Sequence, residues 1–118
     1  MKNNNWVLGS EAESLACSYL EKMDYKIIER NFRCRSGEID IIARHQDYIV
    51  FIEVKYRKDR KCGYPREAVN YYKQKNITRV ASYYLLINGA YDQSCRFDVV
   101  EITNNDIELI ENAFNAVH

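Results

Sequence analysis

Hydrophobic and polar positions follow two rhythms along this chain, and the change from one to the other predicts its elements. Near the N-terminus the apolar residues recur at helical spacing, which predicts an amphipathic helix. Its apolar stripe consists of Leu8, Ala12, Leu15, Ala16, Tyr19, Leu20 and Met23. Runs rich in Ile, Val, Phe and Tyr then predict strands at residues 25–33, 37–43 and 48–55. Because short polar turns separate these strands, we expect an antiparallel meander.

The helical rhythm returns in the second half of the chain. Residues 66–88 predict a long helix, for which Asn88-Gly89 is a suitable stop. The apolar stripe of this helix comprises Val69, Ile77, Val80, Ala81 and Tyr84. Residues 95–102 alternate as a strand, and residues 106–111 are expected to form a short edge strand. We therefore expect a single α/β domain over residues 1–118, with a mixed central sheet that contains the meander and is flanked by helices.

Two of the predicted strands carry acidic residues between apolar neighbours. If the turn is centred between Gln46 and Asp47, Asp40 lies directly opposite Glu53, where facing Cβ atoms are roughly 4.5–5.5 Å apart. Lys55 shares a face with Glu53 because side chains alternate along a strand. Two neighbouring carboxylates need compensation, which Mg²⁺ or Mn²⁺ could provide with Asp40, Glu53 and the Val54 carbonyl as ligands. The alternative is structural, with each acid paired to a Lys or Arg of the sheet.

Charge is unevenly distributed, although the formal net charge of the 118 residues is zero. Residues 55–79 contain nine Lys or Arg and only two acids. A basic run beside an acidic pair suits a polyanion such as nucleic acid, whereas an ordinary solvated face is the simpler alternative. The charged connection at residues 56–65 is also long enough to act as a lid over a bound ligand.

Cysteine spacing and hydropathy narrow the class of protein further. The four cysteines are far apart, with no Cys-x-x-Cys pair, so we expect reduced thiols and no zinc knuckle. No apolar run approaches the roughly 20 residues of a membrane span, and none resembles a signal peptide. We therefore expect a cytoplasmic protein with no membrane partner.

Two charged residues lie at helix positions that leave their roles open. Glu13 flanks the buried stripe of the first helix and could lean toward the Asp40 strand. It could equally complete a capping box with Ser10. Lys73 is aligned with Val69 and Ile77, so its ammonium could reach the acidic face of the sheet or a phosphate held there. Alternatively, its aliphatic stem could extend the ammonium to solvent.

Several segments, in this order and spacing, resemble the YraN family of small bacterial proteins. The resemblance covers roughly residues 8–102, and one departure is Ala12, where the family more often has Gly. The matching segments are Glu13-x-x-Ala16-x-x-Tyr19-Leu20, Glu29-Arg30-Asn31-Phe32-Arg33, Gly37-Glu38-Ile39-Asp40, Phe51-Ile52-Glu53-Val54-Lys55-Tyr56-Arg57, Glu67-Ala68-Val69 with Lys73, and Arg96-Phe97-Asp98-Val99-Val100.

The resemblance implies a restriction-endonuclease-like core of the PD-(D/E)XK type, similar in layout to archaeal Holliday-junction resolvases. On that pattern Asp40, Glu53 and Lys55 match the catalytic acids and lysine, and Glu13 matches the acid of the first helix and a further metal ligand. The implied activity is hydrolysis of phosphodiester bonds with Mg²⁺ or Mn²⁺, structure-selective or nonspecific, in repair or recombination, with DNA favoured over RNA as substrate. Contacts to the nucleic-acid backbone would come from Arg57, Lys58, Arg60, Lys61 and Lys73.

The same residues are compatible with two functions other than catalysis. The chain could be a non-catalytic nucleic-acid-binding module that keeps the nuclease fold, because fold alone does not prove chemistry. It could also be a structural domain whose acids form internal ion pairs. Finally, a homodimer through the tyrosine-rich surface at Tyr71, Tyr72 and Tyr83 is compatible with the composition, which includes ten tyrosines.

Overall fold

The computed structural model describes residues 5–57, 69–104 and 106–118, with side chains from residue 11 onward. These residues form two helices and five strands. In chain order the elements are α1 (Asn5–Lys22), β1 (Lys26–Cys34), β2 (Gly37–His45), β3 (Tyr48–Tyr56), α2 (Tyr71–Ile87), β4 (Cys95–Ile102) and β5 (Ile107–Phe114).

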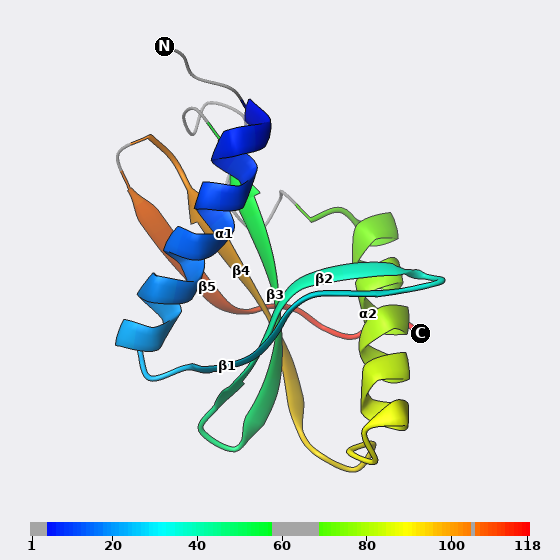
Figure 1. Ribbon diagram of the computed structural model, residues 1–118. Coiled ribbons are helices and arrows are strands. Elements are labelled where there is room, and N and C mark those ends of the chain that lie inside the picture. Colours follow the sequence, from blue (N-terminus) through cyan, green and yellow to red (C-terminus); the bar gives the residue numbers. More distant parts are fainter. Residues whose placement is uncertain (1–4, 58–68, 105) are drawn as a thin grey trace.

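The strands make one mixed sheet in the order β1-β2-β3-β4-β5. Short turns make β1, β2 and β3 an antiparallel meander, as predicted. The crossover through α2 returns the chain beside β3 in the same direction, so that β3 and β4 are parallel, and β5 pairs antiparallel at the edge. Helix α1 lies against one face of the sheet and α2 against the other (Figure 1). The predicted α/β architecture, a mixed sheet flanked by helices, is confirmed.

Alternation along the strands builds a separate apolar cluster on each face of the sheet. Val50 and Ile52 face α1, whereas Phe51 between them faces α2. The α1 side includes Ala12, Ala16, Leu20, Ile41, Ala43, Val50, Ile52 and Val100. The α2 side includes Ile39, Ile42, Phe51, Ile77, Val80, Ala81, Tyr84, Phe97 and Val99. The predicted stripe of α2 is buried throughout, but Leu15 and Met23 of the predicted α1 stripe are exposed.

The alternation breaks at one position of β2. Ile39 packs on the α2 side, whereas Ile41, two residues later, packs on the α1 side. On the neighbouring strand the matching position is Asn31, between the pairs Arg30–Ile41 and Phe32–Ile39, and its φ of 54° is left-handed. Such a local irregularity turns a side chain out of the regular ladder. The residue turned in this way is Asp40.

The observed strands β1, β2 and β3 end one or two residues later than predicted, and the differences at α1, α2 and β5 have more consequence. Helix α1 begins at Asn5, so residues 10–13 lie inside it and the capping box with Ser10 is wrong. Helix α2 begins at Tyr71 because the Asn70 side chain caps it, accepting a hydrogen bond from the Lys73 amide at 2.8 Å. Residues 69–70 are therefore not helical, although the prediction began at 66. Strand β5 extends to Phe114, past the predicted 111. Most of the expected lid falls in residues 58–68, outside the described residues.

A buried polar network lies between β4 and the β2–β3 hairpin. The guanidinium of Arg96 donates to both carboxylate oxygens of Asp98 at 2.9 Å, and the fully buried Asp98 also accepts from the Tyr25 hydroxyl at 2.7 Å. Arg96 further contacts His45 Nδ1 at 2.9 Å, and the His45 ring stacks on Tyr25 at 4.0 Å. These contacts satisfy an ion pair that would otherwise be costly to bury.

None of the helices that the structure describes could cross a membrane.

Candidate active site

Asp40 and Glu53 face each other across the β2–β3 hairpin. The pairing runs from His45–Tyr48 beside a two-residue turn up to Ile41–Ile52, and the next residues along the two strands are Asp40 and Glu53. The predicted register is therefore confirmed. Because Asp40 leaves the regular ladder, its Oδ2 accepts a hydrogen bond from the Val54 amide at 2.8 Å. The Glu53 side chain is only 8% exposed.

The environment of the pair shifts the acidity of Asp40. Burial, followed by the negative charge of Glu53, raises the pKa of Asp40 from 3.8 to about 7, against the lowering effect of the hydrogen bond from the Val54 amide. Like charges in a partly desolvated site cannot both ionise without cost. Near neutral pH the site therefore holds a proton that a cation of higher charge could displace.

Two lysines meet the same oxygen of Glu53. Lys55 Nζ lies 3.4 Å from Glu53 Oε2, and Lys73 Nζ lies 3.6 Å from it. Lys55 comes from β3, two residues after Glu53, as alternation predicted, whereas Lys73 comes from the first turn of α2. Of the two interpretations of Lys73, the structure supports the one in which its ammonium reaches the acidic face of the sheet.

Glu13 borders the pair without joining it. Its Oε1 lies 3.5 Å from an Arg30 nitrogen and 3.1 Å from Asn31 Nδ2, so β1 holds this carboxylate in place. The negative charge of Glu13 still contributes to the raised pKa of Asp40. Arg30 and Asn31 contact the site although the sequence pattern predicts no role for them there. The available signal was an asparagine within a strand, a residue type that is depleted in strands but enriched in the left-handed conformation.

The donor atoms present suit a hard divalent cation. Among the described residues, no group of three or more His, Cys, Asp or Glu side chains is close enough to hold a metal ion. The set that remains is Asp40 with Glu53. Mg²⁺ is often bound by one or two carboxylates, with water and substrate phosphate completing its shell, and Mn²⁺ takes the same oxygen ligands. The residues therefore fit Mg²⁺ or Mn²⁺ but not a structural zinc ion.

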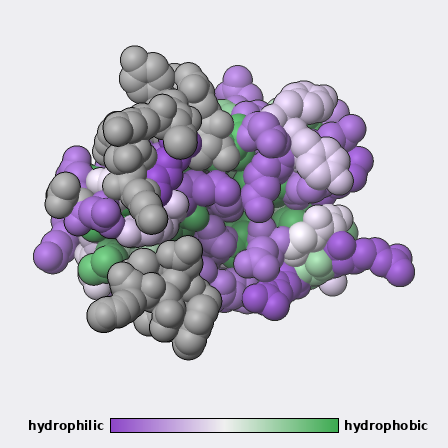
Figure 2. All heavy atoms as spheres, turned by 90° about the horizontal axis from the view of Figure 1, so that it is seen from above, coloured by the Kyte–Doolittle hydropathy of each residue, from purple (hydrophilic) through white to green (hydrophobic). Residues whose placement is uncertain are grey.

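The predicted backbone-binding residues fall into three groups. Lys73 lies at the carboxylates, as described above. Arg57 turns inward instead, with its Nε 2.8 Å from Oε2 of the fully buried Glu101 on β4. Lys58, Arg60 and Lys61 are outside the described residues. Figure 2 looks onto this end of the molecule and shows hydrophilic side chains gathered across its middle.

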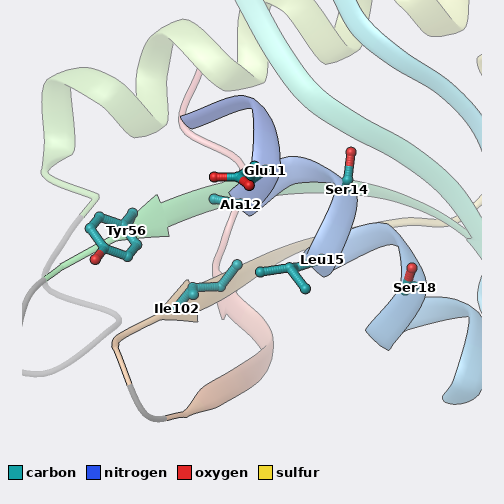
Figure 3. Close-up of a pocket in the computed structure, with 7 residues that line it drawn as sticks. All are labelled: Glu11, Ala12, Ser14, Leu15, Ser18, Tyr56 and Ile102. Carbon is teal, nitrogen blue, oxygen red and sulfur yellow. The ribbon is translucent and has the colours of Figure 1, made fainter. Parts of the chain in front are cut away.

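A separate cavity of about 430 Å³ lies on the other flank of α1 (Figure 3). Leu15 of α1 and Ile102 of β4 form much of its apolar wall, and Tyr56 closes one end. Residues 13 and 15 point in nearly opposite directions on a helix of 3.6 residues per turn. The cavity is therefore separated by α1 from Glu13 and the carboxylate pair, and it is not part of this site.

Binding of Mg²⁺ or Mn²⁺ should release protons because the metal needs an ionised Asp40. With the pKa of Asp40 at about 7, most of a proton should leave at about pH 6 and little at about pH 8.5. Titration calorimetry in buffers of different ionisation enthalpy measures this number directly. In the Asp40→Asn variant the linked release should disappear. If the number of protons released on metal binding does not change with pH, Asp40 is not the group that releases them.

The fold and the site define an α/β protein compatible with a restriction-endonuclease-like core. The chain belongs to the family described as "Uncharacterised protein family UPF0102", whose model matches residues 12–102, and which is the YraN family that its motifs resemble. A UPF0102 protein of Lachnoclostridium phytofermentans is 49% identical, with 96% of this chain and 97% of the relative aligned. A UPF0102 protein of Geobacter metallireducens is 48% identical over 100% of both chains. Another, from Acetivibrio thermocellus, is 50% identical over 96% of this chain and 95% of the relative.

Proposed function

We propose that this protein is an endonuclease that uses Mg²⁺ or Mn²⁺ to hydrolyse phosphodiester bonds in DNA, with structure-selective or nonspecific action in repair or recombination. The observation that carries the proposal is the Asp40–Glu53 pair, in which the pKa of Asp40 rises to about 7 and two lysines meet Glu53. A strongly perturbed acid beside a second acid is typical of active sites, and a purely structural ion pair does not need the second carboxylate.

Each residue of the site has a role in this reaction. Asp40 and Glu53 would hold the cation, with the Val54 carbonyl within the same stretch of β3. When bound, such a cation polarises the scissile phosphate and lowers the pKa of a coordinated water. Lys55 would orient the attacking water or offset the negative charge that develops on the phosphorus oxygens. Lys73 would contact a flanking phosphate, which competes with Glu53 for its ammonium.

Base recognition plays no part in the proposal. Helix α2 packs its apolar stripe against the sheet and presents Lys73 to the carboxylates, so this end of the helix would meet the sugar–phosphate backbone. Contacts to phosphate position a nucleic acid but carry no sequence information. Selection by DNA shape, or no selection at all, follows from such contacts.

The test is a cleavage assay on labelled single-stranded, duplex, flap and four-way-junction DNA. Cuts should appear with Mg²⁺ or Mn²⁺, disappear with a chelator, and fall at least about 100-fold in Glu53→Ala. Glu21→Ala removes an exposed acid of α1 and should cut like the parent protein. Binding without cutting, equal in parent and Glu53→Ala proteins, would instead identify a non-catalytic nucleic-acid-binding module. If neither binding nor cutting occurs, the acids serve the structure alone.

A further inference from the structure

We propose that the outer face of α2 and the tip of the β1–β2 hairpin bind a single nucleic-acid strand that leads away from the Asp40–Glu53 pair. This inference rests on the proposed nuclease function and deepens it by naming the substrate class. The preferred substrate would be DNA with an unpaired segment next to the cut, such as a flap or an overhang.

The surface begins at the carboxylate site. Tyr72 directly precedes Lys73, whose ammonium meets Glu53, and the Tyr72 side chain is 73% exposed. Arg79 and Tyr83 follow at seven and eleven positions beyond Tyr72, which places all three on one stripe of the helix. Arg79 is exposed, and Tyr83 is 46% exposed. At 1.5 Å per residue the stripe is about 16 Å long, so it can contact several nucleotides.

The β1–β2 hairpin adds positive charge at the far end of this stripe. Its tip crosses the middle of α2 (Figure 1), where a Cβ at Gly37 would lie 3.7 Å from Val80. Tyr83 and four residues of the hairpin tip line a hollow of about 270 Å³. The four tip residues are Arg33, Cys34, Arg35 and Ser36. The Arg33 side chain remains 72% exposed even though its Nε lies 3.4 Å from Glu38.

An alternation of exposed aromatic rings and cations fits an unpaired strand. Bases of a single strand can stack on Tyr72 and Tyr83, while its phosphates meet Arg79 and the arginines of the hairpin tip. The bases of a duplex are already stacked on one another, so the tyrosines would gain nothing from it. The core of the sheet is packed by the opposite face of α2. Tyr72 is largely exposed, and Tyr83, whose ring centroid lies 6.3 Å from that of Phe32, keeps 46% of its surface exposed.

Charge argues against a second copy of the chain as the occupant. A two-fold interface brings the same patch of each copy together. Arg33, Arg35 and Arg79 would then face like charges, with only Glu38 among the residues named here to offset them. A polyanion meets no such repulsion, and it uses the tyrosines as well.

Binding of a fluorescent oligo(dT) of about 12 nucleotides tests the proposal in an Asp40→Asn background, which prevents cleavage. Tyr72→Ala and Tyr83→Ala should each weaken binding about 5- to 100-fold, the value expected for one stacked base. The affinity of the same two variants for a blunt duplex should differ from that of the parent by no more than about twofold. Tyr91→Ala removes a tyrosine beyond the end of α2 that is about as exposed as Tyr72, and it should change neither affinity. For Arg79→Gln, the plot of log binding constant for oligo(dT) against log salt concentration should be less steep by about 0.7.

The outcomes separate this inference from the function on which it rests. If the parent protein cleaves DNA but the tyrosine variants bind oligo(dT) like the Tyr91→Ala control, the strand-binding surface is wrong and the nuclease remains. If no DNA is bound or cut at all, the proposed function itself fails. Light scattering on the same variants supplies a third readout, because a dimer that dissociates in Tyr72→Ala or Tyr83→Ala would identify the face as a subunit interface. An oligo(U) arm shows whether RNA is bound as well.

Discussion

Replacing Asp40 with asparagine should stabilise the fold at pH 8 and abolish metal-dependent cleavage. The ionised carboxylate is unfavourable in the folded state, because its pKa there is about 7 instead of 3.8. Each unit of such a shift corresponds to about 1.4 kcal/mol, so relief of this cost should raise the free energy of unfolding by about 2–4 kcal/mol. Asparagine keeps an acceptor for the Val54 amide but cannot hold a divalent cation as the ionised acid does.

The gain from Asp40→Asn should depend on pH in a specific way. Below the ordinary pKa of 3.8, Asp40 is protonated in both folded and unfolded states. Between about pH 4 and 7 the folded state binds the extra proton, so the stability of the parent protein falls as pH rises and levels off above about 7. The difference between variant and parent should therefore be small near pH 4 and largest above pH 7.

Chemical denaturation across this pH range measures both curves, and Asp92→Asn, at an exposed position, should show no such difference from the parent. A constant offset between Asp40→Asn and the parent would contradict the raised pKa. A variant that keeps full cleavage would instead exclude Asp40 from the reaction. Stability gained while activity is lost is a known signature of active-site residues.

The second large effect concerns the buried network around Arg96. Arg96→Met should lower the free energy of unfolding by about 3–5 kcal/mol, because it leaves the fully buried Asp98 carboxylate without its cation. The Tyr25 hydroxyl and the Asn112 amide, at 2.7 and 2.9 Å, would be the partners left to it. The control is Arg33→Met, which removes an exposed ion pair and should lower the free energy of unfolding by at most about 1 kcal/mol. Chemical denaturation curves of the two variants and the parent measure the difference.

A second substitution distinguishes loss of charge compensation from loss of packing. Asp98→Asn in the Arg96→Met background removes the uncompensated charge and should recover part of the stability. If Arg96→Met costs no more than Arg33→Met, the network does not stabilise the fold in the way proposed. If Asp98→Asn recovers nothing, the loss comes from the volume and contacts of the arginine side chain.

The sequence by itself determined the meander and the facing acids. The apolar runs predict the strands, and the position of the short polar turn between β2 and β3 sets the register of that hairpin. That register brings Asp40 opposite Glu53 and puts Lys55 on the same side as Glu53, as the structure shows. The start of α2 was predicted less accurately, because the charged residues before it mark no clear beginning of a helix. In the structure the helix begins after Asn70, whose side chain caps it.

Only the tertiary structure decided what the remaining charged residues meet. Lys73 reaches Glu53 because the crossover between β3 and β4 sets the place of α2 on the sheet, which local spacing does not specify. Arg57 turns to Glu101 because β4 lies beside β3. Asp40 leaves the ladder because β1 and β2 are irregular at Asn31. Periodicity records which face a residue takes within its own element, whereas partners from distant elements depend on how those elements pack together.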